Sequence, residues 1–213
     1  SVRLGASTLL PIAARATVRA GLGGFEWAVG VPGTVGGGVA MNAGGHGSDV
    51  AASLVRCSVF NLRDGGPTEW VAADLRFGYR QSALGPDDLV LYVELGLEPS
   101  DRARSEALLT DIVRWRREHQ PGGANAGSVF ANPGPESAGW LIDAAGLKGF
   151  RIGTAAVSTK HANFIQTDAG GAADDVFRVL RHVRQVVFER TGIALRPENR
   201  LVGFDDESLL EAR

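Results

Sequence analysis

The chain has 213 residues, of which 44% are hydrophobic and 22% are charged, and its formal net charge is −2. This length accommodates one large domain or two small ones, and the composition is ordinary for a globular protein. The charge gives no electrostatic footprint for nucleic acid and no run is long and apolar enough to span a bilayer, so we expect no nucleic-acid partner, no membrane insertion and a cytoplasmic location.

The chain begins with a predicted helix and a loop rich in glycine. Helical spacing covers residues 9–22, and Ser7 or Thr8 is placed to cap its start. The glycine loop, residues 30–44, reads Gly-Val-Pro-Gly-Thr-Val-Gly-Gly-Gly-Val-Ala-Met-Asn-Ala-Gly. Runs of β-branched and aromatic residues then predict strands over 53–62 and 88–97.

The composition shifts near residues 98–101, which indicates a second unit of alternating strands and helices. Apolar periodicity and turn residues predict helices over 104–119, 137–145 and 173–191, and strands over 150–157, 163–167 and 193–196. Gly192 is expected to stop the last helix.

The glycine loop has two interpretations. Its main chain could approach a flat or anionic ligand closely, and its N–H groups could hold a phosphate. Its glycines could equally form only turns. A P-loop is excluded because no Gly-Lys-Ser/Thr follows, and the glycine spacing does not fit a Rossmann fingerprint.

Other residues could carry chemistry, and each has a structural alternative. Ser128 follows small residues that would admit a ligand, but it could be a turn serine. Arg80 could stabilise developing negative charge or lie on the surface. Glu198 could be an acid or a solvated side chain, and Lys148 could bind phosphate or lie at a helix end. Cys57 lies in an apolar run, which favours a buried thiol. It is the single cysteine of the chain, which excludes a cysteine-based zinc site.

Seven segments, taken together, resemble one known family. They are residues 24–37, 41–44, 79–82, 126–133, 141–149, 157–164 and 196–200. In this order they are similar to the UDP-N-acetylenolpyruvoylglucosamine reductases, also called UDP-N-acetylmuramate dehydrogenases, the flavoproteins of bacterial peptidoglycan synthesis. The match runs from one end of the chain to the other.

The resemblance implies an α+β fold in two parts. Residues 1–103 would be the C-terminal part of an FAD-binding PCMH-type domain, which is like that of vanillyl-alcohol oxidase. Residues 104–213 would form the α+β substrate-binding domain. The N-terminal part of the FAD domain is expected to be missing from this chain. The short stretch of sequence between Arg80 and Ser128 fits the compact subclass of the family, which lacks an extra substrate-covering loop.

The resemblance also implies a reaction. FAD, reduced by NADPH, would pass hydride to UDP-N-acetylglucosamine enolpyruvate and so give UDP-N-acetylmuramate. Arg80, Ser128 and Glu198 match the catalytic residues, with Ser128 as the proton donor to carbon. The implied cofactor-binding residues are Gly30, Pro32, Gly33, Thr34, Gly36, Gly37, Asn42 and Gly44, and the implied substrate-binding residues are Tyr79, Asn132, Lys148 and His161. We expect no metal and a monomer.

Two other functions stay open at this point. The chain could belong to an FAD-dependent oxidase or dehydrogenase of another hydroxy acid or sugar. It could also be a non-catalytic fragment that binds a UDP-sugar. The match at Ser128, Arg80 and Glu198 favours the reductase.

Overall fold

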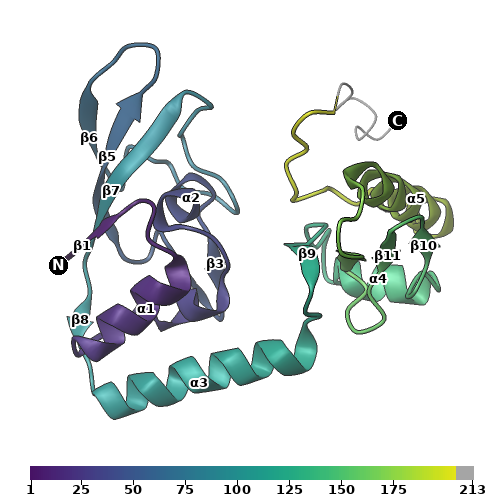
Figure 1. The fold of residues 1–213 in the computed structure, drawn as a ribbon, viewed down its shortest axis with the longest axis horizontal. Coiled ribbons are helices and arrows are strands. Elements are labelled where there is room, and N and C mark those ends of the chain that lie inside the picture. Colours follow the sequence, from purple (N-terminus) through teal and green to yellow (C-terminus); the bar gives the residue numbers. More distant parts are fainter. Residues whose placement is uncertain (205–213) are drawn as a thin grey trace. The chain divides into compact units, whose positions relative to one another are not determined.

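The computed structural model describes residues 1–204, which fall into two compact units that divide after Arg116 (Figure 1). The sequence-based boundary between 103 and 104 lies near the start of helix α3 (Arg102–His119), whereas the units divide near its end. The reason is that Leu109 and Ile112 of α3 are buried in the core of the first unit. The last residues of the second predicted domain, 205–213, lie outside the described part of the chain.

The first unit is a small sheet covered by short helices. Its elements are β1 (Val2–Gly5), α1 (Leu10–Arg19), β2 (Leu22–Gly23), the 3₁₀ helix η1 (Glu26–Gly30), α2 (Val35–Ala40), β3 (Gly44–Gly45), β4 (Ser48–Asp49), β5 (Leu54–Asn61), β6 (Pro67–Val71), β7 (Asp88–Leu95) and β8 (Glu98–Pro99). The main sheet has the strand order β1-β7-β5-β6, and neighbouring strands are antiparallel.

Strands β5 and β7 confirm the two strands predicted from β-branched runs. Their inward side chains, including Cys57, Val59, Val93 and Leu95, are buried, because alternate residues of a strand face the same side of the sheet. Burial raises the pKa of the Cys57 thiol to about 11. Cys57 is therefore protonated at neutral pH, as expected for a buried thiol rather than a nucleophile.

Helix α1 confirms the first predicted helix, but its start is not capped by Ser7 or Thr8. Its N-cap is Leu9, which makes no side-chain capping bond. The Leu10 N–H donates instead to the carbonyl of Gly33 at 2.9 Å. The glycine loop thus supplies the acceptor that a capping side chain would otherwise provide.

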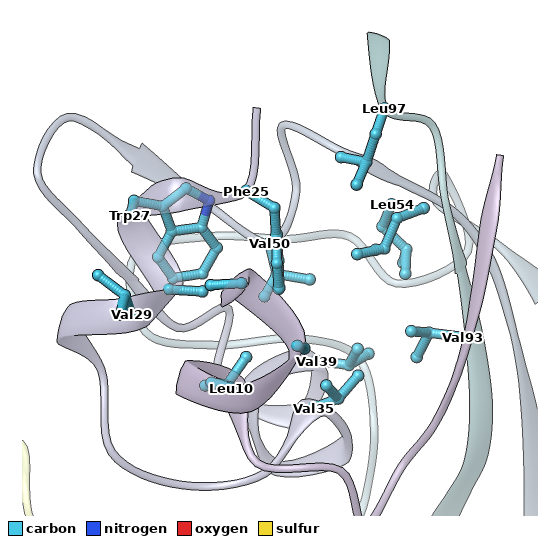
Figure 2. Packing of buried hydrophobic residues seen from close by; sticks show 14 of the residues in the cluster. Leu10, Phe25, Trp27, Val29, Val35, Val39, Val50, Leu54, Val93 and Leu97 are labelled. Carbon is cyan, nitrogen blue, oxygen red and sulfur yellow. The ribbon is translucent and has the colours of Figure 1, made fainter. Parts of the chain in front are cut away.

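The core of the first unit joins the helices to the inner face of the sheet (Figure 2). Leu10 of α1 and Val35 and Val39 of α2 are almost completely buried, as is Val93 of β7. Because Val35 and Val39 of α2 lie in this core, the middle of the glycine loop is anchored to the sheet.

The second unit packs two helices on another antiparallel sheet. Its elements, after the end of α3, are β9 (Ala124–Ser128), α4 (Ala138–Ala144), β10 (Arg151–Ile152), β11 (Ala155–Val157), β12 (Phe164–Thr167) and α5 (Ala173–Thr191). The sheet order is β10-β11-β12-β9. Val179, Leu180, Val183 and Val187 of α5 are buried, and Gly192 ends the helix with a φ of 72°, as predicted.

Two predicted strands of this unit are wrong. Residues 150–157 form the hairpin β10–β11 instead of one strand, because Gly153 turns the chain with a φ of 51° and Asp175 of α5 accepts the Thr154 N–H at 2.8 Å. Residues 193–196 form no strand. The chain that follows pairs with 129–131 through an isolated bridge between Phe130 and Pro197.

No helix within residues 1–204 combines the length and the apolar character needed to cross a membrane.

Candidate functional site

Three glycines of the loop are required by packing within the protein. A Cβ at Gly36 would lie 2.8 Å from the Ala6 Cβ, and one at Gly44 would lie 2.6 Å from the Ser48 carbonyl oxygen. A Cβ at Gly30 would lie 2.9 Å from Ile112 of α3. These distances are shorter than ordinary contacts between carbon or oxygen atoms, so the absence of side chains lets neighbouring segments approach.

The start of helix α2 is also occupied by protein groups. The Val35 N–H donates to the Thr8 carbonyl at 2.8 Å, and the Gly36 N–H donates to the Ala6 carbonyl at 2.9 Å. The Gly37 N–H donates to the Thr34 hydroxyl at 3.2 Å, which is an N-cap bond. These N–H groups are therefore not free to cradle a phosphate, as a glycine-rich helix start often does.

The outer side of the glycine loop is open. Pro32, Gly33 and Gly37 are exposed, and Gly33 has a φ of 116° with open space where a Cβ would lie. A flat ligand could approach the main chain closely at Gly33 and Gly37, because neither carries a side chain.

The loop ends in a tight hairpin beside a hollow. Strands β3 and β4 are joined through His46 and Gly47, whose φ angles of 53° and 83° fit a two-residue turn with both central residues left-handed. The adjacent hollow has a volume of about 360 Å³. It is lined by Gly44, Gly45, Gly47, Ser48, Asp49, Ala52, Tyr79 and Arg80.

Arg80 is held against the end of the glycine loop. Its Nη2 donates to the Gly44 carbonyl at 2.9 Å, and its Nη1 approaches the Asn42 carbonyl at 3.4 Å. The hydroxyl of Ser82 donates to the Ala40 carbonyl at 2.9 Å. The segment 79–82 is thereby fastened to the end of α2, and a permanent cation lies at the edge of the hollow.

Asn42 is the buried link between these segments. Its Nδ2 donates to the Gly78 carbonyl at 3.0 Å and to the Asp49 carboxylate at 3.2 Å, and its Oδ1 accepts the Ala51 N–H at 3.0 Å. Asn42 has a φ of 40°, which asparagine tolerates better than most residues. Its side chain is thus committed to protein groups, so the structure gives it a structural role in holding Arg80 beside the loop.

In the second unit, Ser128 and Glu198 are brought to adjacent chain segments. Ser128 is the last residue of β9 and is exposed. The Glu198 N–H donates to the Val129 carbonyl at 2.8 Å, and the Ala131 N–H donates to the Arg196 carbonyl at 2.9 Å. The short ladder between 129–131 and 196–198 therefore fixes the backbone of Glu198 next to the residue that follows Ser128.

Glu198 carries a carboxylate oxygen without a partner. Its Oε1 is buried, and no hydrogen-bond partner for it lies within residues 1–204. A buried polar atom in this state costs free energy unless a ligand or another group supplies a bond. The arrangement is typical of a functional site rather than of a solvated surface glutamate.

His161 and Lys148 lie on the same side of the second unit. His161 packs against α4, where a Cβ at Gly139 would lie only 3.1 Å from its Cε1. Burial lowers the pKa of His161, and the charge of Lys148 lowers it further, while a backbone hydrogen bond acts in the opposite direction. The Lys148 Nζ also forms an ion pair with Asp143 at 2.5 Å. His161 is therefore neutral at neutral pH, beside an exposed cation.

Comparisons with known proteins agree on one family. The model of the UDP-N-acetylenolpyruvoylglucosamine reductase C-terminal domain matches residues 119–202. A protein of that name from Synechococcus sp. (strain WH7803) is 43% identical over 209 residues, covering 96% of this chain and 67% of that protein. The crystal structure of the reductase from Thermus caldophilus aligns with a TM-score of 0.84 and 38% identity, covering 92% of this chain and 71% of that one.

The chain belongs to the UDP-N-acetylenolpyruvoylglucosamine reductase family. Its mixed α+β structure agrees with that family. The reductase of Trichormus variabilis is 43% identical over 205 residues, which are 95% of this chain but 62% of that protein. The chain thus spans a little under two thirds of the length of that family member.

Within the family fold, the predicted site residues form one group in each unit. Asn42, Gly44, Tyr79 and Arg80 meet at the hollow or beside it in the first unit. In the second, the backbone of Glu198 bonds Val129, which follows Ser128, and His161 is linked to the same segment through Asn163. The Asn132 side chain bonds the start of α4, where its Oδ1 accepts the Ala138 N–H at 3.0 Å.

Sequence reasoning assigned no role to Asn163, although the stretch 157–164 resembles the family. Asn163 is buried and bonds the main chain of Phe130. A single sequence does not show which distant residue a side chain bonds. The one signal available was a polar asparagine between apolar neighbours. Within residues 1–204, no group of three or more histidine, cysteine, aspartate or glutamate side chains could hold a metal ion.

Proposed function

We propose that this chain carries the substrate-binding and proton-donating part of a flavoprotein that reduces UDP-N-acetylenolpyruvoylglucosamine to UDP-N-acetylmuramate with NADPH. The observation that carries the proposal is the pairing of Glu198 with Val129, the residue that follows Ser128, together with a buried Glu198 oxygen that has no hydrogen-bond partner within residues 1–204. Its family relatives bear the name of this activity.

We also propose that residues 1–103 are the later part of an FAD-binding PCMH-type domain. The exposed glycines Gly33 and Gly37, which carry no side chains, fit a flat ring system, and so does the hollow beside Arg80. The start of α2 fits a pyrophosphate poorly, because its N–H groups are already bonded. We therefore assign FAD to the outer side of the loop and to the hollow. In this assignment Gly30, Gly36 and Gly44 serve the packing of neighbouring segments, and Asn42 serves through the hydrogen bonds of its side chain.

FAD, once bound and reduced by NADPH, would supply a hydride for the vinyl carbon of the enolpyruvyl ether. Negative charge then develops at the adjacent carbon and its carboxylate. Arg80 suits that charge because its guanidinium is always ionised and is held in place by two carbonyl oxygens. The N–H groups that these carbonyls leave free can bond a carboxylate.

Ser128 is proposed to donate the proton that completes the reaction at carbon. A serine hydroxyl is a weak acid, so the acceptor must be strongly basic and close, and a carbanion-like centre meets that requirement. Ser128 is exposed and follows Gly127, which adds no side chain to block the approach. The Glu198 carboxyl would act with Arg80 at the substrate carboxylate, as an acid.

Tyr79, Lys148 and His161 are proposed to bind the sugar nucleotide. Lys148 is a cation suited to the diphosphate, and neutral His161 can donate one hydrogen bond from Nε2, because its Nδ1 already accepts the Asn163 N–H. We further propose that the protein acts in the cytoplasm as a monomer, which its mass in solution would test.

The proposed function is tested by following the flavin absorbance of the purified protein. NADPH should bleach the flavin, and the enolpyruvyl sugar nucleotide should restore it under anaerobic conditions with formation of UDP-N-acetylmuramate. A simple sugar or hydroxy acid serves as the control substrate. Bleaching that is reversed only by the control substrate would overturn the proposal in favour of another oxidoreductase.

A further inference from the structure

We propose that Asn163 is a positioning residue that sets the Ser128 hydroxyl for proton transfer. The inference rests on the proposed function of Ser128, and its argument comes from the main-chain bonds around residues 128–131. Asn163 does not touch the reacting atoms in this account. It acts through the backbone that carries Ser128.

The Asn163 side chain holds both polar groups of one peptide residue. Its Oδ1 accepts the Phe130 N–H at 2.9 Å, and its Nδ2 donates to the Phe130 carbonyl at 2.8 Å. Its own main-chain carbonyl accepts the Val129 N–H at 2.9 Å. Asn163 is only 4% exposed, so water cannot readily replace these bonds.

These bonds lie where the chain after Ser128 changes its pairing partner. Up to Ser128, β9 pairs with β12, and Ser128 is opposite Phe164. From Val129 onward, the main chain pairs with residues 196–198 instead. The β9–β12 ladder also shifts register between Phe164 and Gln166. Pairing with 196–198 uses the carbonyl of Val129 and the N–H of Ala131 but neither polar group of Phe130, and the Asn163 amide bonds both of these.

The same residue connects Ser128 to the other predicted site residues. The Asn163 N–H donates to the His161 Nδ1 at 3.2 Å, which requires a neutral His161 whose proton is on Nε2. The Val129 carbonyl, on the residue held by Asn163, accepts the Glu198 N–H. A shift of the segment 129–131 would therefore move Ser128 and Glu198 relative to His161.

Loss of the two Asn163 side-chain bonds to Phe130, called the Asn163 clamp below, should affect proton delivery more than flavin reduction. Ser128 is exposed, so we expect the position of its hydroxyl to follow the position of its backbone. A misplacement of about 1 Å in a reacting group can cost ~10²-fold in rate. Reduction of the flavin by NADPH needs no proton from Ser128, so it should keep its rate.

The test compares Asn163→Ala with Val179→Ala in the flavin-containing protein. Val179 is fully buried in α5, so its truncation weakens the apolar core of the same unit but removes none of the hydrogen bonds that hold 129–131. For Asn163→Ala we expect reoxidation by saturating enolpyruvyl sugar nucleotide to slow by ~10²-fold, with NADPH reduction unchanged within about twofold. Val179→Ala should show neither change well below its unfolding temperature.

A second readout needs neither flavin nor substrate. Hydrogen exchange should accelerate at the amides of 129–131 in Asn163→Ala, and not in Val179→Ala. Asn163→Asp keeps the size of the side chain and its acceptor oxygen but removes the Nδ2 donor. This variant replaces Asn163→Ala in the test if the alanine variant does not fold. The same two readouts apply to it, with slowed reoxidation and faster exchange at the same amides as the expected results.

The outcomes separate this inference from the proposed function. Reoxidation of the Asn163 variants as fast as that of Val179→Ala overturns the positioning role. So does an equal loss in both half-reactions that Val179→Ala reproduces, because that loss would be structural. Failure of the substrate to reoxidise the wild-type flavin overturns the proposed function instead. In that case, hydrogen exchange at the amides of 129–131 that is unchanged in the Asn163 variants would still show that Asn163 does not hold this segment.

Discussion

Asn42 and Asn163 are buried amides, one in each unit, that bind main-chain groups of segments distant in the sequence. Each lies beside a residue with a proposed catalytic role, Arg80 in the first unit and Ser128 in the second. A buried amide whose donors and acceptor are satisfied fixes geometry more narrowly than apolar packing does. The functional loops of this protein are therefore held by side-chain amides as well as by strand pairing.

Asn42→Ala should lower the free energy of unfolding of the first unit by about 1–3 kcal/mol, because it leaves the Ala51 N–H and the Gly78 carbonyl without their partner. The loss should occur in protein without flavin, and urea denaturation measures it. Asn125→Ala is the control, since the Asn125 side chain bonds only exposed loop groups. A loss that occurs only when flavin is present would support direct contact with the cofactor and contradict a structural role.

Helix α2 shows how element-scale packing depends on individual glycines. The helix contains three consecutive glycines, and it still forms because Thr34 caps it and its N–H groups bond residues 6 and 8. Of these glycines, Gly36 faces Ala6, whereas Gly37 is exposed. Neighbouring positions in one short helix therefore have opposite tolerance for a methyl group.

Gly36→Ala should destabilise the first unit by about 1–3 kcal/mol, because the added methyl group would overlap Ala6. Gly37→Ala is the matched control, in which the nearest atom is the Thr34 hydroxyl oxygen at 3.4 Å. That change should be neutral or should stabilise the helix by about 0.5–1 kcal/mol, since alanine loses less entropy than glycine. Equal effects of the two substitutions in denaturation curves would show that the contact with Ala6 is not tight.

The sequence pattern predicts correctly those helices and strands in which buried residues recur at the regular spacing of the element. The long helix α5 and strands β5 and β7 match their predictions, because apolar spacing decides them. The 150–157 prediction was wrong because its turn depends on Gly153 and on a distant bond to Asp175. The start of α1 was likewise decided by the Gly33 carbonyl rather than by a nearby hydroxyl.

At the scale of the whole molecule, each unit has its own apolar core. Sequence patterns predicted two units, but α3 belongs mainly to the first because Leu109 and Ile112 are buried there. The residues of the candidate site could be named from the family resemblance. Their hydrogen-bond partners could not, since Asn42 with Gly78 and Asn163 with Phe130 are each more than 30 residues apart.

Both units should lose stability in mild acid, because each contains a histidine with a lowered pKa. Burial lowers the pKa of His46, with a smaller contribution from Arg116, and burial also lowers that of His161. The unfolded chain, with a histidine pKa of 6.5, then binds more protons than the folded protein below that pH. The free energy of unfolding therefore falls as the pH drops below about 6.5 and is unaffected by these groups above it.

This pH dependence is measured by urea denaturation between about pH 5 and pH 8. The double substitution His46→Gln and His161→Gln should flatten the fall below pH 6.5. Val179→Ala, which removes no titrating group, should lower the whole curve without changing its slope. An unchanged slope in the double variant would contradict the assignment of these two histidines.

The central claim is that Ser128 delivers the proton to the reduced substrate, and Ser128→Ala tests it most directly. Anaerobic stopped-flow absorbance separates flavin reduction by NADPH from flavin reoxidation by the enolpyruvyl sugar nucleotide. We predict that reduction stays within about twofold of the wild-type rate, whereas reoxidation slows by ~10²–10⁴-fold, the usual contribution of a general acid. Reoxidation of the Ser128→Ala flavin at the wild-type rate would contradict the account.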